Sequence, residues 1–313
     1  MIISQPFLRK RVHHKSLWRR IWDHRQIYLL ILPTVIYFFI FYYMPMNGLQ
    51  IAFRDYRVSK GIWGSNWVGV KYFIKFFNHP QCWNIIRNTL QLSLYTLATF
   101  PLSIIVSLLI NEIRSNTYKK TIQMVTYAPH FISTVVIVSM INLFLNQSTG
   151  LINSVIRSFG GNTIDFLGKS KYFSHIYVWS GVWQDLGWGT IIYLATLSSV
   201  SLELYEAAYI DGANRIQIIR HINVPSILPT IIIMLIMQCG RILSVGFEKV
   251  LLLQNSLNLD VSQVISTYTY EIGLRGGQYS YSTAIGLFNT VVNVVVLVMV
   301  NTISKQLSDV SLW

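Results

Sequence analysis

The chain is poor in the residues that mark several large classes of protein. Only 12% of its 313 residues are charged, and its two cysteines, Cys82 and Cys239, lie far apart. Two such cysteines support neither a disulfide framework nor a cysteine-rich metal site. The seven histidines show no ligand-like spacing apart from an adjacent pair near the start of the chain. We therefore expect no metal site, and a soluble enzyme is disfavoured.

Sequence motifs of nucleotide binding and of intramembrane catalysis are also missing. The chain has no Gly-x-x-x-x-Gly-Lys-Ser/Thr phosphate loop and no His-Glu-x-x-His helix. No serine or aspartate motif of an intramembrane enzyme stands at membrane depth. We therefore expect no catalytic residue and no cofactor in this chain, so that ATP and Mg²⁺ would belong to partner subunits. No internal repeat or polar linker divides the sequence, which predicts one helical domain.

Hydrophobic residues are abundant instead and make up 52% of the chain. Runs of about 20 apolar residues recur, and this is the length at which a helix crosses a bilayer. The pattern predicts an all-α multispan membrane protein with about six transmembrane helices. We place these helices at about 27–45, 89–111, 121–146, 173–198, 226–252 and 282–303.

The distribution of positive charge predicts how these helices are oriented. The net charge is +13, and seven of the 25 basic residues lie in the first 25 positions, ahead of the first apolar run. Basic segments next to a span stay in the cytoplasm and contact anionic lipid, so membrane lipid rather than nucleic acid is the expected partner. The expected organisation is a cytoplasmic basic tail at 1–26, a transmembrane domain at 27–303 and a cytoplasmic C-terminus at 304–313. Six crossings then place both termini and the loop at 199–225 in the cytoplasm.

The segment between the first two predicted spans would be external. It is rich in glycine and tryptophan at 61–69 and in aromatic and basic residues from there to Trp83. Such side chains prefer the headgroup region of a membrane. Two interpretations stay open, namely docking of an extracellular protein and simple anchoring of the second span.

The loop at 199–225 has the composition of a water-exposed helix, although long apolar runs flank it on both sides. Its alanines favour a slender helix, its glycine permits a turn, and Pro225 stands where a new helix can begin. We predict that a partner docks on this loop, although an ordinary surface loop is the alternative. The residues predicted to act there are Glu206, Ala207, Ala208, Asp211, Gly212 and Arg215.

Polar side chains within the apolar runs form a second candidate site. A central Arg or Asp costs about 2.5–3.5 kcal/mol on insertion scales, so such residues tend to face a cavity or a partner. Aromatic rings mixed with amides and carboxylates suit a sugar, whereas interfacial anchoring or pairing between helices would explain the same residues. The residues predicted to line the pathway are Asn142, Trp183, Asp185, Trp188, Tyr193, Gln238, Arg241 and Glu248.

The spacing in the 199–225 loop resembles a known motif. Glu-Ala-Ala, three residues, Gly, nine residues and Ile-x-Leu-Pro is typical of the cytoplasmic coupling loop of ATP-binding-cassette (ABC) importer permeases, and this chain differs only in Val224. Further stretches resemble the polysaccharide branch of the oligosaccharide-permease family, which is related to the maltose-type subunits. They lie at 32–33, 45–53, 67–69, 88–90, 109–114, 127–133, 187–195 and 311–313.

This resemblance implies a type I ABC importer permease fold in a bacterial plasma membrane. It implies a complex of two permease subunits, here a related pair, two ATPase subunits and an extracellular solute-binding lipoprotein. In that family the Glu-Ala-Ala helix fits a groove on the ATPase, so Glu206, Ala207, Ala208 and Gly212 would contact the motor. The implied cargo is an oligosaccharide or a polysaccharide fragment. The alternative function is an ion-coupled secondary transporter, which would need no ATPase and would show a buried acid that titrates with transport.

Overall fold

The computed structural model describes residues 22–308 and 310–313, so residues 1–21 of the predicted basic tail lie outside the described residues. The described chain is helical almost throughout. Its strands are β1 (Arg54–Asp55) and β2 (Asn66–Trp67), which form a two-stranded antiparallel ribbon. The predicted all-α class is confirmed.

The chain divides into two compact units, residues 1–50 and 51–313. The described part of the first unit is dominated by α2 (Arg25–Phe38), which continues through a π-helical turn (Phe39–Tyr43) into a 3-10 helix (Met44–Phe53). None of the side chains of α2 is buried, although nearly all are apolar. A helix that is apolar all round and carries no charge over its central turns has the composition of a membrane span.

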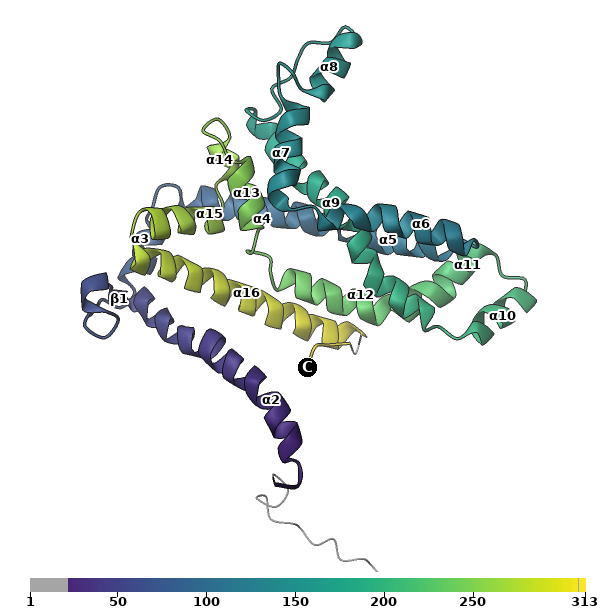
Figure 1. The fold of residues 1–313 in the computed structure, drawn as a ribbon, viewed down its shortest axis with the longest axis horizontal. Helices are drawn as coiled ribbons and strands as arrows, with labels where there is room; N and C mark the ends of the chain where they lie inside the picture. Colours follow the sequence, from purple (N-terminus) through teal and green to yellow (C-terminus); the bar gives the residue numbers. More distant parts are fainter. Residues whose placement is uncertain (1–21, 309) are drawn as a thin grey trace, which may run out of the picture. The chain divides into compact units, whose positions relative to one another are not determined.

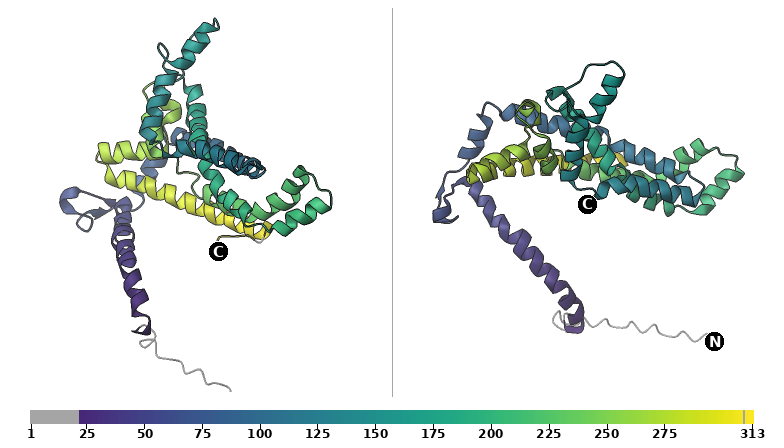
Figure 2. Two further views of the ribbon diagram at one scale, coloured as in Figure 1. Left: turned by 45° about the vertical axis from the view of Figure 1, so that its right-hand side comes forward. Right: turned by 45° about the horizontal axis from the view of Figure 1, so that its top comes forward.

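The second unit holds the remaining helices (Figure 1). In chain order they are α3 (Lys71–Phe77), α4 (Cys82–Ala98), α5 (Phe100–Asn111), α6 (Asn116–Tyr127), a 3-10 turn (Ala128–Phe131), α7 (Thr134–Leu145), α8 (Leu151–Ser158), α9 (Ser170–Ser198), α10 (Leu202–Ile210), α11 (Arg215–Ile218), a π-helical turn (Ile219–Asn223), α12 (Val224–Cys239), α13 (Phe247–Leu253), α14 (Leu259–Ser262), α15 (Ile265–Tyr270), a π-helical turn (Glu271–Arg275) and α16 (Tyr279–Ser308). The long helix α9 packs against α5, α6 and α12, and α16 packs against α12, α15 and α3 (Figures 1 and 2).

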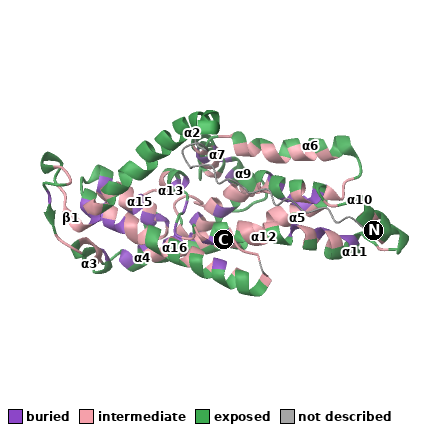
Figure 3. Cartoon of the chain, turned by 90° about the horizontal axis from the view of Figure 1, so that it is seen from below, coloured by how far each residue is buried: buried purple, intermediate pink, exposed green. Residues whose placement is uncertain are grey.

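Two buried apolar clusters hold this unit together. One joins α3, α4, α15 and α16 through residues such as Phe76, Ile85 and Ile285, and it includes Cys82. The other joins α4, α7, α9 and α13 through residues such as Leu92 and Phe173. Buried positions lie between the helices, while the outward faces are exposed, as expected for helices that face lipid (Figure 3).

The membrane spans follow the prediction in number more closely than in position. Four described helical segments are long and apolar enough to cross a membrane: Arg25–Phe53, Cys82–Asn111, Arg215–Cys239 and Tyr279–Ser308. The bent pair Asn116–Phe131 and Thr134–Leu145 makes a fifth if it is counted as one span. The remaining predicted span, 173–198, is α9, whose 29 residues are long enough but less apolar than the others.

Two predicted spans are wrong, one in its bounds and the other because its helix is bent. The predicted span 226–252 begins earlier, at Arg215, and ends earlier, at Cys239. The helix ends there at Gly240, which packs closely against α16, since an added Cβ would lie 2.6 Å from Cδ1 of the Leu297 side chain. The predicted span 121–146 is bent by 94° around residues 132–133, where the 3-10 turn with Pro129 ends and Ser133 caps α7 by accepting from the Val136 amide.

The segment between the first two spans contains the β1–β2 ribbon rather than a featureless loop. The guanidinium of Arg54 lies 5.6 Å from the ring centroids of both Trp63 and Trp67, whose rings are exposed. The Tyr72 hydroxyl donates to Asp55 at 2.6 Å. This bond lowers the pKa of Asp55, while burial and the neighbouring carboxylate raise the pKa of Tyr72 to about 12. The ribbon is thus pinned to α3, and it presents tryptophan rings to its surroundings.

Candidate functional site

The loop between α9 and α12 is a short helix with well-defined ends. At its start, the Ser201 side chain accepts a hydrogen bond from the Glu203 amide. At its end, Gly212 has φ of +76°, its amide donates to the Tyr209 carbonyl, and the Ala213 amide donates to the Ala208 carbonyl. This pair of bonds around a left-handed glycine is a Schellman motif, which stops α10 and reverses the chain. The turn predicted at Gly212 is therefore present.

The chain re-enters a helix directly after this turn. Asn214 and Gln217 form a reciprocal capping box, with side chain to amide distances of 2.9 and 2.7 Å. From Arg215 the helix runs on to Cys239, which is a candidate span. The loop thus joins α10 to a membrane helix through a turn of only a few residues, and both ends of that turn are fixed by hydrogen bonds.

The residues predicted to act in this loop share an exposed surface. Glu206, Ala207, Asp211, Gly212 and Arg215 are exposed, and Ala208 is half-buried. Apolar side chains accompany them and are also largely open to solvent, namely Leu202, Leu204, Tyr209, Ile210 and Ile216. Such an apolar surface on a capped helix is what a docking surface requires. That an ATPase covers it stays a prediction.

A partly buried hydrogen-bond chain connects this loop to the C-terminal end of α5. The Tyr205 hydroxyl donates to Asn223 Oδ1 at 2.7 Å, and Asn223 Nδ2 donates to Glu112 Oε1 at 3.3 Å. Asn223 has no exposed surface. Burial raises the pKa of Tyr205, and the charge of Glu112 raises it further. Sequence reasoning did not single out these three residues, because each is an ordinary polar residue near a helix end.

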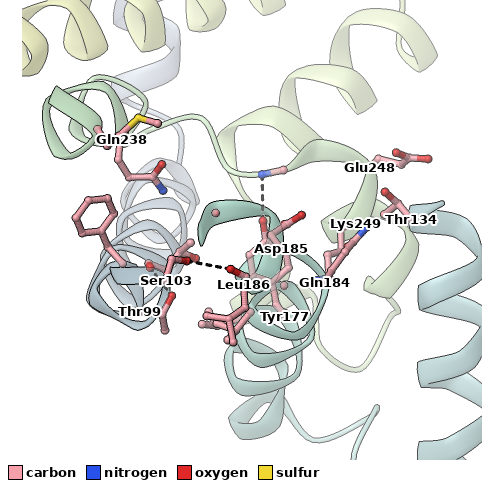
Figure 4. A pocket seen from close by; sticks show the side chains of 18 of the residues that line it. Thr99, Ser103, Thr134, Tyr177, Gln184, Asp185, Leu186, Gln238, Glu248 and Lys249 are labelled. Atoms are coloured by element: carbon pink, nitrogen blue, oxygen red, sulfur yellow. Dashed lines mark hydrogen bonds between the residues drawn. The ribbon is translucent and has the colours of Figure 1, made fainter. Parts of the chain in front are cut away.

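A cavity of about 630 Å³ lies between α4, α5, α7, α9, α12 and α13. Four residues predicted from the sequence line it, namely Asp185, Tyr193, Gln238 and Glu248. Sequence reasoning missed several others, among them Lys249, Tyr177, Thr96, Thr99, Ser103 and Thr134. Figure 4 shows Asp185 and Tyr177 near the centre of the cavity lining, with Gln238 on the opposite side of the view from Glu248 and Lys249. The hydroxyl-bearing residues come from several helices and carry no charge, so nothing in the sequence distinguishes them.

The other predicted pathway residues do not line this cavity. Arg241 lines a neighbouring hollow of about 260 Å³, which shares four lining residues with the cavity, namely Thr96, Tyr177, Gln238 and Gly246. Asn142 and Trp183 are exposed on α7 and α9. Their part in a pathway stays a prediction.

Trp188 belongs to a cluster at the bend between α6 and α7. Its ring stacks on His130 with a centroid distance of 4.4 Å and an interplanar angle of 6°. Nδ1 of His130 lies 2.9 Å from Oδ1 of Asp185. One oxygen of this cavity carboxylate is therefore held by a histidine that Trp188 supports, so Trp188 positions Asp185 without lining the cavity.

The two glycines beside Trp188 allow close packing of helices. The helix α9 is continuous through Gly187 and Gly189. A Cβ at Gly187 would collide with the carbonyl of Thr126 in α6, and one at Gly189 would lie 2.7 Å from Oγ of Ser103 in α5. The small residues thus let α9 approach two neighbours, as is usual between membrane helices.

We expect Gly187→Ala to lower the thermal unfolding temperature of the purified protein. The added methyl group meets backbone, which cannot rotate away, and overpacking of this kind typically costs about 1–3 kcal/mol. Gly286→Ala is the matched control, because it is also helical and a Cβ there meets nothing within 4 Å. The control should be neutral or slightly stabilising, since alanine is favoured over glycine by up to about 1 kcal/mol in a helix. Equal unfolding temperatures for the two variants would contradict the close approach.

No group of three or more His, Cys, Asp or Glu side chains within the described residues is arranged to hold a metal ion. The geometry thus offers an exposed, capped helix on one loop and a polar cavity between helices. The two features share α9 and α12, because α9 ends just before the loop and the helix that leaves the loop continues into α12. A displacement of α10 would therefore act on helices that form the cavity wall.

Comparison with known proteins identifies this arrangement. Residues 84–309 match the family model described as binding-protein-dependent transport system inner membrane component. The chain belongs to this family. The matched region includes the loop with α10 and all residues that line the cavity. Membership makes the chain a multispan inner-membrane component of a transport system.

Similar proteins cover nearly the whole chain. Protein LplB of Bacillus subtilis is 44% identical over 288 residues, which are 92% of this chain and 91% of LplB. The polygalacturonan/rhamnogalacturonan transport system permease protein YteP of the same species is 41% identical and covers 97% of this chain and 95% of its own length. Among solved structures, a chain of a bacterial ABC transporter involved in the import of the acidic polysaccharide alginate is 39% identical with a TM-score of 0.87, over 94% of this chain and 100% of that chain.

Proposed function

We propose that this chain is one permease subunit of an ATP-driven importer that carries an oligosaccharide or a polysaccharide fragment across a bacterial plasma membrane. The single observation that supports this most strongly is the loop with α10. It is a capped helix with an exposed apolar and acidic surface, placed between membrane helices in a member of a binding-protein-dependent transport family. The names of YteP and of the alginate transporter support a saccharide as cargo.

The proposed complex contains a second, related permease, two ATPase subunits and an extracellular solute-binding lipoprotein. The ATPases bind ATP and Mg²⁺ and dock on the surface formed by Glu206, Ala207, Ala208 and the turn at Gly212. Both termini and this loop face the cytoplasm. Closure of the ATPases moves α10, and the hydrogen-bond chain through Tyr205, Asn223 and Glu112 carries that movement to α5, which forms one wall of the cavity.

The lining of the cavity suits the hydroxyl groups of a sugar. Three hydroxyls already donate their protons within the protein: Thr96 to the Leu92 carbonyl, Thr99 to Thr96 and Ser103 to Leu186. Their lone pairs remain free to accept from a sugar hydroxyl. The rings of Tyr177, Phe100 and Phe247 supply the apolar surface on which pyranose faces pack. A site of this kind recognises a saccharide without covalent chemistry.

Reconstitution of the purified complex into proteoliposomes tests the proposal against the secondary transporter. We expect this chain to copurify with an ATPase, and we expect saccharide uptake to need ATP inside the cytoplasmic compartment together with the binding protein outside. Dissipating proton and sodium gradients with ionophores should leave uptake unchanged. Uptake by this chain without an ATPase, abolished by ionophores, would reject the importer in favour of ion coupling.

A further inference from the structure

Lys249 is a cation inside the cavity with no anion beside it. Its side chain is 9% exposed, yet it lines the cavity. Across the described residues, no carboxylate oxygen lies within the 4.0 Å limit of an ion pair with its ammonium group; the pairs found are Arg57 with Asp55 and His130 with Asp185. A buried charge without a partner is unfavourable, so proteins rarely keep one without a use.

The surroundings of Lys249 hold its ammonium group in place. Nζ lies 5.3 Å from the ring centroid of Tyr177, as in a cation–π contact. The Tyr177 hydroxyl is itself fixed, because it accepts a hydrogen bond from the Gly246 amide at 3.1 Å. One turn further along α9, Gly181 also lies against the ammonium group, because a Cβ there would be in ordinary van der Waals contact with Nζ at 3.4 Å. The position of the charge is thus set by α9 and by the turn before α13.

No acidic residue of the cavity forms an ion pair with this cation. Asp185 places one oxygen 2.9 Å from His130 Nδ1, and its negative charge acts on Lys249 only from beyond the 4.0 Å of an ion pair. Glu248 precedes Lys249 on α13 and is exposed. Of the described residues that line the cavity, Lys249 is the one lysine or arginine. The cavity therefore offers a single fixed positive charge among hydroxyls, amides and aromatic rings (Figure 4).

We propose that Lys249 binds the carboxylate of a uronic acid unit and selects acidic oligosaccharides over neutral ones. This proposal rests on the proposed saccharide importer. A sugar carboxylate would supply the anion that the buried ammonium group lacks, through a charge-assisted hydrogen bond. The hydroxyls of Thr96, Thr99 and Ser103 would accept from the sugar hydroxyls, which carry no charge. Lys249 would thus bind the carboxylate group, which is what distinguishes a uronic acid from the corresponding neutral sugar.

The test compares two trisaccharides in proteoliposomes that contain the complete transporter and its binding protein. Trigalacturonate is the acidic probe, and galactotriose with the same linkages is the neutral one, since it has hydroxymethyl groups in place of carboxylates. Wild type is compared with Lys249→Met, which keeps the length of the chain without charge, and with Lys249→Arg, which keeps the charge. Lys171→Met is the control, because Lys171 also lies over a tyrosine ring but is exposed outside the cavity.

We expect Lys249→Met to lower the initial rate of trigalacturonate uptake at least tenfold. Lys249→Arg and Lys171→Met should stay within about threefold of wild type. ATP hydrolysis stimulated by the loaded binding protein, measured in the same vesicles, should remain within about twofold, which shows that the complex is folded and docked. Any uptake of galactotriose should be unchanged by Lys249→Met.

Two results would overturn the proposal while leaving the importer intact. One is equal trigalacturonate uptake by wild type and Lys249→Met. The other is an equal loss of both sugars in Lys249→Met, which would assign Lys249 a purely structural role. Wild-type vesicles that import neither these trisaccharides nor any other saccharide with ATP would instead refute the proposed function itself.

Discussion

Replacing Gly212 with valine is expected to abolish uptake while the permease still inserts and assembles. Gly212 has φ of +76°, a conformation that costs L-amino acids about 1–2 kcal/mol and is least compatible with β-branched residues. No atom would clash with an added Cβ, so the cost falls on the backbone alone. The valine variant would relieve it by giving up the Schellman bonds of Ala213 and Gly212, which set the angle between α10 and α11. We expect uptake in proteoliposomes to fall more than tenfold, with ATP hydrolysis retained but uncoupled.

Gly212→Asn provides the matched control, because asparagine tolerates the left-handed region better than any other side chain with a Cβ. It should keep at least half of the wild-type uptake. Span insertion, checked by protease protection of the loops, should be the same in both variants, since residue 212 lies outside the spans. Wild-type uptake by Gly212→Val would show that the turn does not transmit movement.

The loop was predictable because its residues act through local chemistry. Two alanines within a helix and a glycine after it favour a helix and a left-handed stop with no help from the rest of the fold. Ala207, Ala208 and Gly212 occupy these positions in the structure. The long apolar runs were predictable for the same reason, since burial in lipid depends on composition over about 20 residues.

The shapes of the spans were not predictable from hydropathy. The 94° bend near residue 132 and the end of α12 at Cys239 lie within sequence that is apolar on both sides. Both features lie where the chain contacts neighbouring helices, as Gly240 does with Leu297 in α16. A window that averages 20 residues cannot resolve such contacts, so the predicted span 226–252 ran through a real helix end.

The sequence predicted that polar residues line a cavity between the helices, but it identified only some of those residues. Asp185, Tyr193, Gln238 and Glu248 stood out as polar groups in apolar runs, and they line it. Lys249 carried the same signal, a charged residue within an apolar run, but it was not among the predicted pathway residues. Neighbours on a helix point about 100° apart, and in the structure the lysine is buried while the adjacent Glu248 is exposed. Sequence distance alone does not reveal which of two adjacent charges is buried.

Reversing the charge at Glu206 is expected to release the ATPase from the permease. Glu206 is exposed on α10, where Leu204, Tyr209 and Ile210 offer apolar contact area around it. If a basic group of the ATPase faces Glu206, then an arginine there places like charges together in a partly dehydrated interface, which costs several kcal/mol. Glu206→Arg should therefore reduce the amount of copurified ATPase more than tenfold, as measured by quantitative immunoblotting after mild detergent extraction.

The matched variants separate this charge effect from misfolding. Glu206→Gln keeps the size and helix propensity of the side chain, so it should retain part of the ATPase. Glu271→Arg makes the same change at an exposed glutamate far along the chain, in the π-helical turn before α16, and should leave copurification unchanged. Because α10 makes its capping and Schellman bonds through Ser201 and Gly212, none of these substitutions disturbs the helix itself. Full ATPase recovery with Glu206→Arg would place the docking surface elsewhere and would leave the apolar exposure of α10 to be explained by another partner.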